Sequence, residues 1–400
     1  MGSHTRFSCC FCQRTLILLL FVSSVTFQLF ALFLSYRSER PLKVPSVGKA
    51  PVSSILWEIQ SHLQLQRQSV EPTVDFNISK WNFTGSEDLD YRLNIDMPEL
   101  VRRISSGLPV DIQPINEPVF DVLISHAEIC TNIERRNQQP PELLILIKSA
   151  PGNFILRDTI RVGWGDESCW GGRHIVRLFL LGAIPDSQTD VSSRIAMEVS
   201  FHGDVIQQNF IDDYYNNTYK IMFGIDWAVN NCANVPVIMF VDDDFFVYPR
   251  NVIAFIEGLS IAIREHLAAG YVWRDAKPIR TKRYRHLKKW VIDWNDYPDA
   301  QYPPYVAAGN FFISMQVARK MHIASRFTKY LRFDDVFLGI VLKKLLLTPM
   351  HLPQIYAFSP VNESSNQLEL MLSSHRFGNP ARQLALWDRL QCRTFCTPNR

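Results

Sequence analysis

The sequence predicts a protein of the α/β class, with a mainly parallel sheet covered by helices on both faces. Two observations support this prediction. From about Pro118 onward, short apolar runs typical of buried strands alternate with stretches typical of helices. Strands that alternate with helices form parallel sheets, since each crossover returns the chain to the same edge. The second observation is Val235–Val241, an apolar run that ends directly in three aspartates.

The remaining elements follow in chain order. Leu143–Lys148 and Ile175–Leu181 read as buried strands, and Arg157 and Arg161 stand four residues apart, on one face of a helix between them. The other expected elements are a short segment at 204–207, a helix at 214–231, a helix at 252–269, a glycine-led strand at 307–314 and a helix from Asp335 to about 347.

The acidic triplet Asp242, Asp243 and Asp244 is the first candidate site. Ligands of open α/β sheets collect where strands end at their carboxyl edge. Three adjacent carboxylates repel one another unless a cation is present, and hard divalent cations prefer carboxylate oxygen. A solvated acidic turn is the competing interpretation, but the apolar runs on both sides favour a site for a cation that carries a phosphate.

The N-terminal part of the chain predicts a membrane anchor. Residues 15–36 carry no charge and are long enough to span a bilayer. A cleaved signal peptide is the alternative, but no small-residue cleavage site follows the run. Basic residues lie on both sides of this segment, so charge alone does not give its orientation.

Acceptor triplets for N-glycosylation supply the orientation. Asn77, Asn82, Asn216 and Asn362 each begin such a triplet, and all four follow the apolar segment. We therefore expect a type II membrane protein with a cytosolic tail at 1–14, an anchor at 15–36, a lumenal stem at 37–117 and a globular domain at 118–400. The stem is expected because residues 37–117 are rich in proline, serine and scattered charge.

Composition narrows the class of function. The chain has 42 Lys+Arg against 39 Asp+Glu, and this near-neutral balance argues against a nucleic-acid-binding protein. A local basic run, Arg280–Lys289, is either a solvated face or a rim that attracts an anion. Five cysteines would face an oxidising lumen, and their spacing leaves the pairing open: Cys130, Cys169, Cys232, Cys392 and Cys396.

A series of motifs, in order along the chain, resembles the β-1,3-galactosyltransferase family of glycosyltransferases, known as family 31. It is most similar to the brainiac-type β-1,3-N-acetylglucosaminyltransferases. The motifs that carry this resemblance are Arg157…Arg161…Trp164-Gly165, Phe179-Leu-Leu-Gly182, Gly203-Asp204-Val-Ile-Gln, Asp213-Tyr214-Tyr…Lys220, Val241-Asp-Asp-Asp244, Tyr302-Pro-Pro-Tyr305…Gly309, Asp334-Asp335-Val…Gly339 and Ser-His375-Arg-Phe-Gly.

The resemblance implies a GT-A fold with a Rossmann-like sheet and inverting transfer from a UDP-sugar. Mn²⁺ would neutralise the diphosphate leaving group. The family pattern implies that Asp244 binds the metal directly, and that Asp242 and Asp243 position the ribose and the waters of the metal. His375 is a candidate third metal contact, with a surface or packed histidine as the alternative.

The resemblance also implies a catalytic base. Inversion by a single displacement requires a group that takes the proton of the acceptor hydroxyl, and the family motif gives this role to Asp335. Asp334 stands where the family pattern has Glu, and helix capping would account for it. Arg157, Arg161 and Lys220 would offset nucleotide charge, or alternatively form salt bridges between sheet and helix. Trp290, Trp294, Tyr297 and Tyr305 would form an acceptor-side region or belong to the core.

Three functions follow as alternatives. The favoured one is β-1,3 transfer from UDP-GlcNAc to a glycan or glycolipid acceptor. The second is the same reaction with UDP-Gal or UDP-GalNAc. The third is a non-catalytic lumenal chaperone or lectin, against which the intact Asp242–Asp244 triplet and Asp335 argue. The resemblance implies a Golgi membrane location with a lumenal catalytic domain, and homo- or hetero-oligomers with other transferases.

Overall fold

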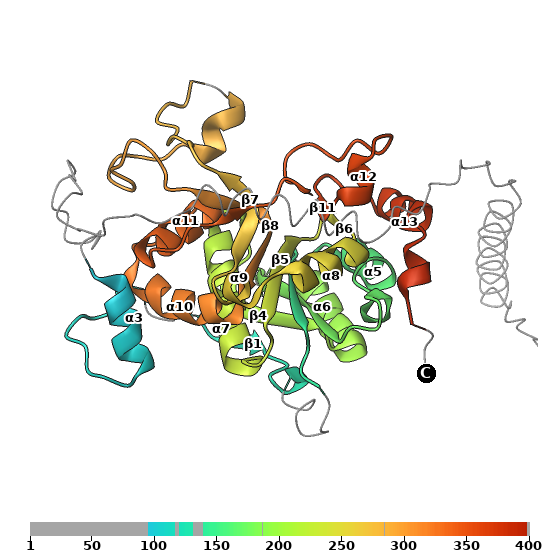
Figure 1. The fold of residues 1–400 in the computed structure, drawn as a ribbon, viewed down its shortest axis with the longest axis horizontal. Helices are drawn as coiled ribbons and strands as arrows, with labels where there is room; N and C mark the ends of the chain where they lie inside the picture. Colours follow the sequence, from blue (N-terminus) through green and yellow to red (C-terminus); the bar gives the residue numbers. More distant parts are fainter. Residues whose placement is uncertain (1–94, 117–119, 131–138, 186, 284, 398–400) are drawn as a thin grey trace, which may run out of the picture. The chain divides into compact units, whose positions relative to one another are not determined.

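The computed structural model of the chain describes residues 95–116, 120–130, 139–185, 187–283 and 285–397. Its centre is an eight-stranded sheet, in the order β1-β4-β3-β2-β5-β8-β7-β9 (Figure 1). The strands are β1 (Val122–Ile124), β2 (Leu143–Lys148), β3 (Ile175–Ala183), β4 (Val205–Ile211), β5 (Val237–Asp242), β7 (Ala268–Trp273), β8 (Tyr305–Ser314) and β9 (Met350–His351).

The sheet is mixed, whereas the sequence predicted a mainly parallel one. Strands β4, β3, β2 and β5 run parallel to one another, as expected. Strand β8 then pairs antiparallel with β5 and with β7, and β1 pairs antiparallel with β4. The parallel half carries the acidic triplet at its edge, and the antiparallel half extends the sheet beyond it.

Helices cover both faces of the sheet, as the sequence predicted (Figure 1). Alternation along β2 separates the two cores, since Leu144 and Leu146 face one and Leu143, Ile145 and Ile147 the other. The helices of the first core are α3 (Met97–Ser105), α7 (Asn217–Asn231), α10 (Met315–Ala324) and α11 (Asp334–Lys344). The helices of the second core are α5 (Phe154–Val162), α6 (Thr189–His202), α8 (Pro249–Gly258) and α13 (Pro380–Arg389).

The predicted helix at 252–269 is wrong in its second half. Helix α8 ends at Gly258, and a short helix α9 (Ile261–Glu265) follows, with Ser260 as its N-cap. The residues from Ala268 onward form β7. Hydrogen bonds to β8, which starts 37 residues further along the chain than β7, override the helical pattern of this segment.

A small second sheet brings the C-terminal segment to the acidic triplet. Strand β6 (Phe246–Val247) begins just after the triplet and pairs antiparallel with β11 (Ser373–Ser374). Strand β10 (Ile355–Tyr356) pairs parallel with β11. Because β11 ends at Ser374, His375 leaves this sheet beside the triplet.

The packed body begins before Pro118. Helix α3 lies within the range expected for the stem, and its residues Met97, Leu100 and Val101 are buried in the first core, with the helix against α10. The tail, the anchor at 15–36, and Asn77 and Asn82 lie outside the described residues. Within the described part, no helix has both the length and the apolar character needed to cross a membrane.

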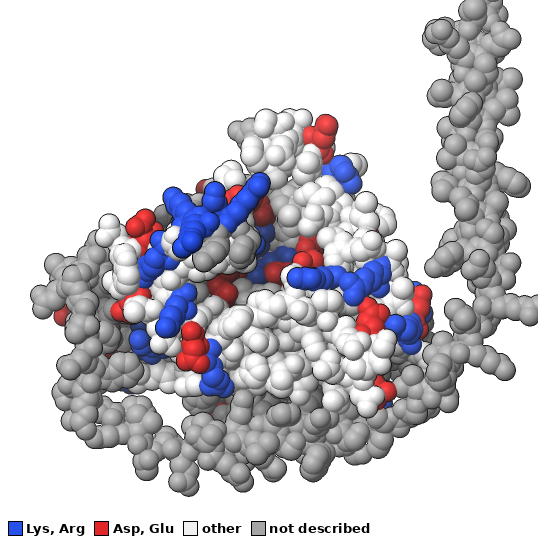
Figure 2. Space-filling view, turned by 90° about the horizontal axis from the view of Figure 1, so that it is seen from above, with Lys and Arg blue, Asp and Glu red and all other residues white. Residues whose placement is uncertain are grey.

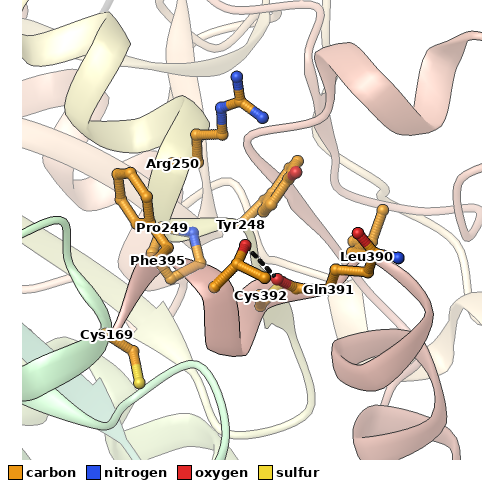
Figure 3. Close-up of a pocket in the computed structure, with 9 residues that line it drawn as sticks. Cys169, Tyr248, Pro249, Arg250, Leu390, Gln391, Cys392 and Phe395 are labelled. Carbon is orange, nitrogen blue, oxygen red and sulfur yellow. Dashed lines mark hydrogen bonds between the residues drawn. The ribbon is translucent and has the colours of Figure 1, made fainter. Parts of the chain in front are cut away.

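Two disulfides close long segments of the chain, and they resolve the pairing that the spacing left open. Cys130 pairs with Cys232, and Cys169 pairs with Cys396. Cys392 is a buried free thiol. It lines a pocket of about 240 Å³ next to the second disulfide, together with Tyr248, Arg250 and neighbouring residues (Figure 3). Neither acidic motif lies in this pocket.

Candidate active site

The three acids of the triplet lie on two sides of the chain. The side chains of Asp242 and Asp244 are 36% and 38% exposed, whereas Asp243 is only 7% exposed. Asp242 ends β5, and Asp243 and Asp244 form a turn closed by a hydrogen bond from the Phe245 N–H to Asp242 O at 3.2 Å, which directs the middle acid away from its neighbours. The triplet therefore presents two carboxylates outward and anchors itself with the third.

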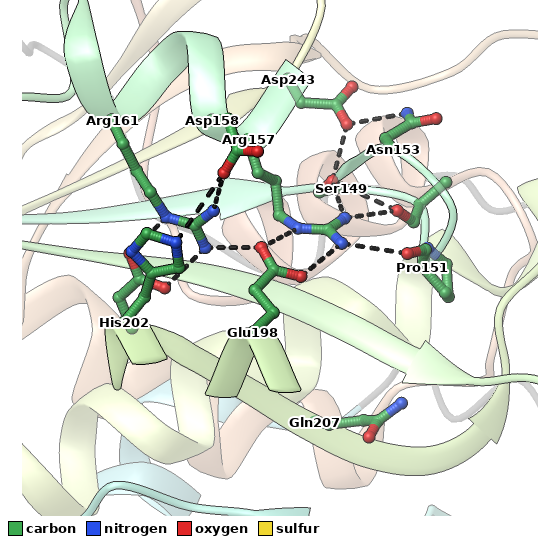
Figure 4. Close-up of polar contacts among 12 residues, drawn as sticks. Ser149, Pro151, Asn153, Arg157, Asp158, Arg161, Glu198, His202, Gln207 and Asp243 are labelled. Atoms are coloured by element: carbon green, nitrogen blue, oxygen red, sulfur yellow. Dashed lines mark hydrogen bonds and ion pairs between the residues drawn. The ribbon is translucent and has the colours of Figure 1, made fainter. Parts of the chain in front are cut away.

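Asp243 is held from within by the loop that follows β2. Its Oδ2 accepts hydrogen bonds from Ser149 Oγ at 2.7 Å and from Asn153 Nδ2 at 2.9 Å (Figure 4). Its backbone N–H donates to Lys148 O at 3.1 Å. Burial raises its pKa, and the bonds from Asn153 and Ser149 oppose the rise. These contacts make Asp243 an anchor for the triplet.

Lys148 joins the two acidic motifs. It is the last residue of β2 and the direct neighbour of Asp242 in the parallel register. Its Nζ lies 2.8 Å from Asp242 Oδ1 and 3.4 Å from Asp334 Oδ2, and its side chain is nearly fully buried. The two carboxylates raise the pKa of Lys148, against the effect of burial. The ammonium group is therefore a fixed positive charge between the triplet and α11.

Arg157 and Arg161 form salt bridges inside the protein, which was the alternative to a role in offsetting nucleotide charge. Arg157 is completely buried, and its guanidinium pairs with Glu198 at 2.7 Å and donates to Ser149 Oγ at 3.0 Å (Figure 4). Arg161 pairs with Glu198 at 2.6 Å and with Asp204 at 2.8 Å. Arg157 thus reaches the triplet through Ser149, while Arg161 ties α5 to α6 and to the start of β4.

Lys220 is likewise buried inside the protein. Its Nζ donates to Ser149 O at 2.9 Å and pairs with Asp212 at 2.8 Å. Burial lowers the pKa of Lys220, and Asp212 opposes this effect. Since its partners are the loop after β2 and the end of β4, Lys220 positions that loop, as Arg157 does.

His375, the candidate third metal contact, lies against Asp244. Its Nε2 lies 2.9 Å from Asp244 Oδ2, and its ring stacks on Phe245 with the centroids 5.1 Å apart. The hydrogen bond to Asp244 raises the pKa of His375, and burial opposes the rise. The backbone N–H of Phe377 donates to Asp244 O at 2.7 Å, which fixes the two segments to each other.

The donor set at Asp244 fits a divalent cation in part. Asp244 Oδ1 and His375 Nδ1 are buried and have no hydrogen-bond partner. A carboxylate oxygen and an imidazole nitrogen are ligands that Mn²⁺ accepts. Asp242 is engaged by Lys148, however, and in the described ranges no three His, Cys, Asp or Glu side chains are grouped to hold a metal.

Asp335 lies in the first turn of α11. Its Oδ1 accepts from the backbone N–H of Val336 at 2.8 Å. Burial raises the pKa of Asp335, with Asp334 adding to the rise. Burial raises the pKa values of Tyr302 and Tyr305, and the Asp335 carboxylate adds to the rise in both. The result is a carboxylate that takes up a proton more readily than an ordinary aspartate.

Helix capping does not account for Asp334. The N-cap of α11 is Phe333, and no side chain caps the helix. Asp334 is the first helical residue, and its carboxylate faces Lys148 instead. The shorter side chain at this position is therefore part of the link between α11 and the triplet.

The aromatic region divides into core and surface. Tyr297 and Tyr305 are buried, whereas Trp290 and Trp294 are 38% and 55% exposed. Trp290 belongs to the 3-10 helix η4 (Arg285–Trp290), and its Nε1 donates to Tyr214 OH at 3.1 Å. Burial raises the pKa of Tyr214, and Asp334 and Asp335 add to the rise.

The surface of the site is hollowed and charged. Figure 2, seen from above relative to Figure 1, shows Asp and Glu side chains inside a hollow with Lys and Arg side chains along its rim. The segment between β7 and β8 rises on one side of the sheet edge in Figure 1, and the C-terminal segment lies on the other. The arrangement suits an anionic ligand that meets acids through a cation.

Three residues of this network were not identified from the sequence. They are Lys148, Ser149 and Asn153. The signal for Lys148 was a lysine that closes an otherwise apolar strand, where burial requires a paired charge. Ser149 and Asn153 stand in a turn-like cluster, and nothing in the pattern separates them from ordinary turn residues.

This site and the α/β sheet define the class of protein: two acidic motifs at the carboxyl edge of a nucleotide-binding type of sheet make the chain a glycosyltransferase with a GT-A-like fold. The particular family follows from sequence comparison. The chain belongs to the galactosyltransferase family, whose model matches residues 156–353.

The relatives agree with this assignment. Beta-1,3-galactosyltransferase brn of Drosophila melanogaster is 37% identical over 64% of this chain and 76% of its own length. UDP-GlcNAc:betaGal beta-1,3-N-acetylglucosaminyltransferase 7 of Rattus norvegicus is 33% identical over 70% of each chain. Human beta-1,3-galactosyltransferase 2 is 31% identical over 68% of this chain and 62% of its own length.

Proposed function

We propose that the protein transfers a sugar from a UDP-sugar to a glycan or glycolipid acceptor, with inversion, and forms a β-1,3 linkage. The observation that carries this proposal is the Lys148 bridge between Asp242 and Asp334. It joins the acids suited to the donor side to the helix that bears Asp335. A base held next to a donor site is what a single displacement requires.

In the proposed reaction, Asp335 acts on the acceptor. The acceptor hydroxyl oxygen attacks the anomeric carbon while the bond from that carbon to the diphosphate breaks, and Asp335 takes the hydroxyl proton. Its raised pKa suits this role, because a base is most effective when its pKa is near the working pH. The exposed Trp290, which donates a hydrogen bond to Tyr214, offers an aromatic face for the acceptor sugar.

On the donor side, Asp244 and His375 would hold a divalent cation, for which Mn²⁺ is our proposal. When bound, such a cation supplies positive charge to the diphosphate leaving group. Asp242 stays oriented by Lys148, and Asp243 keeps the triplet in place through Ser149 and Asn153. Arg157 and Lys220 act on the donor side only through the loop after β2.

UDP-GlcNAc is the favoured donor, and UDP-Gal or UDP-GalNAc is the alternative. Names of relatives support both sugars, since one group is named for galactosyl and another for N-acetylglucosaminyl transfer. A non-catalytic chaperone or lectin role is the remaining alternative. We also propose a Golgi membrane location, with residues 15–36 as a type II anchor, and association with other transferases.

The test is a donor panel. The full chain, purified in detergent, is incubated with Mn²⁺ and UDP-GlcNAc, UDP-Gal or UDP-GalNAc, against β-mannosyl and β-galactosyl acceptors, and UDP release is followed. We expect turnover with one donor, β-1,3 linkage in the product, and loss of turnover with EDTA or in Asp244→Ala. A chain that neither turns over nor binds UDP would favour the non-catalytic alternative.

A further inference from the structure

Arg376 has a backbone conformation that arginine rarely adopts. Its φ is +68°, in the left-handed region that favours glycine. A strained residue persists only where its surroundings determine it, and such residues gather at functional sites. Arg376 directly follows His375, the partner of Asp244.

The surroundings of Arg376 do fix its backbone. On one side the N–H of His375 donates to Tyr356 O at 2.9 Å, and on the other the N–H of Phe377 donates to Asp244 O at 2.7 Å. Arg376 O itself accepts from Arg382 Nη1 at 3.1 Å. The turn is thereby tied to the acidic triplet, so a shift of Arg376 would disturb Asp244.

The side chain of Arg376 is exposed, and it differs from the neighbouring basic residues of this segment in its partners. Arg382 and Arg389 both pair with Glu363, at 3.0 Å and 2.7 Å. For Arg376 no ion pair or side-chain hydrogen bond occurs with any residue that the structure describes.

We infer that Arg376 binds the diphosphate of the nucleotide-sugar donor next to Asp244 and offsets the charge of the leaving group. The inference rests on the proposed UDP-sugar donor. A guanidinium forms two parallel hydrogen bonds to phosphate oxygens, which an ammonium group cannot do. The clamped backbone explains why strain is retained here: the hydrogen bonds of its neighbours to Tyr356 and Asp244 hold the turn that carries Arg376 beside the triplet.

Glycine provides a variant that removes the charge without adding strain. Arg376→Gly suits the left-handed backbone, so the fold should be kept or gain stability. Leu346→Gly is the matched control, because Leu346 also has a positive φ, of +57°, and is exposed after the end of α11. Arg376→Lys keeps the charge and the strain.

The experiment measures binding of UDP and UMP by calorimetry, with the full chain in detergent, in Mn²⁺ and again in EDTA. In Arg376→Gly we expect the Kd for UDP to rise about tenfold or more, with UMP changed by less than about twofold. In Arg376→Lys the Kd for UDP should rise about threefold. Leu346→Gly should bind UDP and UMP with the same affinity as the unaltered chain.

Two results would overturn the inference. Equal UDP affinity in Arg376→Gly and the unaltered chain would leave Arg376 without a donor role while the proposed function stands. An equal loss of affinity for UMP and UDP in Arg376→Gly would indicate a general disturbance of the site rather than a lost contact to the diphosphate. Absence of UDP binding to the unaltered chain would overturn the proposed donor, and with it this role of Arg376.

Discussion

Lys148 is the residue on which the geometry of the site depends most. It is buried, it lies between two carboxylates, and each carboxylate belongs to a different element. A buried charge is stable only when it is paired, and removing one partner leaves the other uncompensated. The lysine thus offsets the repulsion between Asp242 and Asp334 and holds β5 and α11 in a fixed arrangement.

Replacing Lys148 with Met should destabilise the protein. Asp242 and Asp334 would lose their shared cation, and we expect a loss of about 3 kcal/mol in the free energy of unfolding. UDP binding should weaken as well, since Asp242 is no longer oriented. Denaturant unfolding measures the first effect and calorimetry the second. The exposed Lys288→Met serves as control, and equal stability of the two variants would contradict the proposed bridge.

Asp335 sets the pH dependence that we expect of transfer. Burial and Asp334 raise its pKa to about 7. A base acts in its deprotonated form, so kcat/KM should be constant above this pKa and fall about tenfold per pH unit below it. An ordinary aspartate would place the same fall near pH 4. A kcat/KM profile that stays flat down to pH 5 would argue against this base.

Asp335→Asn separates the base from the rest of the site. General-base catalysis contributes about 10²- to 10⁴-fold, and we expect a loss of this size in kcat. Binding of UDP should stay unchanged, because the donor side uses the triplet. Parallel measurement of kcat and of UDP affinity distinguishes the two outcomes, and wild-type turnover would exclude Asp335 as the base.

At the scale of elements, close approach of α11 to β8 carries Asp335 to its place. A Cβ on Gly339 would lie 2.5 Å from Tyr305 Cβ and 3.1 Å from Pro304 O. The glycine allows the helix to contact the strand backbone, which holds the first turn of α11 against the buried tyrosines. Gly309 does the same for β8, where a Cβ would meet the ring of Phe245 at 2.6 Å.

Gly339→Ala should therefore displace α11. Overpacking of this kind costs about 1–3 kcal/mol, and transfer should fall because Asp335 moves with the helix. The control is Gly152→Ala, since a Cβ there meets nothing within 4 Å. Thermal unfolding and kcat are measured for both variants. If Gly339→Ala matched Gly152→Ala in both, the packing of α11 on β8 would not govern the position of the base.

At the scale of the whole molecule, the disulfides join distant parts of the chain. Cys169–Cys396 connects residues 227 apart and fastens the C-terminal segment, which also contains His375, to the body. Cys130–Cys232 connects residues 102 apart. Cross-links over long loops restrict the unfolded chain, which is the main source of their stabilising effect.

The double variant Cys169→Ser, Cys396→Ser should lose about 2–5 kcal/mol in the free energy of unfolding. Transfer at low temperature should persist, because neither cysteine belongs to the acidic network. Cys392→Ala keeps both disulfides, and its free energy of unfolding should fall by only about 1 kcal/mol. Denaturant unfolding compares the three proteins, and loss of transfer in the folded double variant would mean that the disulfide also positions His375.

The sequence alone determined the class of fold and the acids of the site. Short apolar runs and their spacing predicted β2, β3 and β5 and the position of the triplet, because buried strands and acidic strand ends are local patterns. Helices on both faces of the sheet also followed from the alternation of elements, and the motifs predicted the family to which the chain belongs.

Only the tertiary structure decided which strands pair and which charged side chains form ion pairs. The antiparallel half of the sheet and the conversion of residues 268–273 into β7 depend on pairing with β8. The burial of Arg157, Arg161 and Lys220, and the Lys148 bridge, depend on elements far apart in the sequence. A sequence pattern identifies which residues carry charge, but the energy of a charge is set by the groups that folding brings around it.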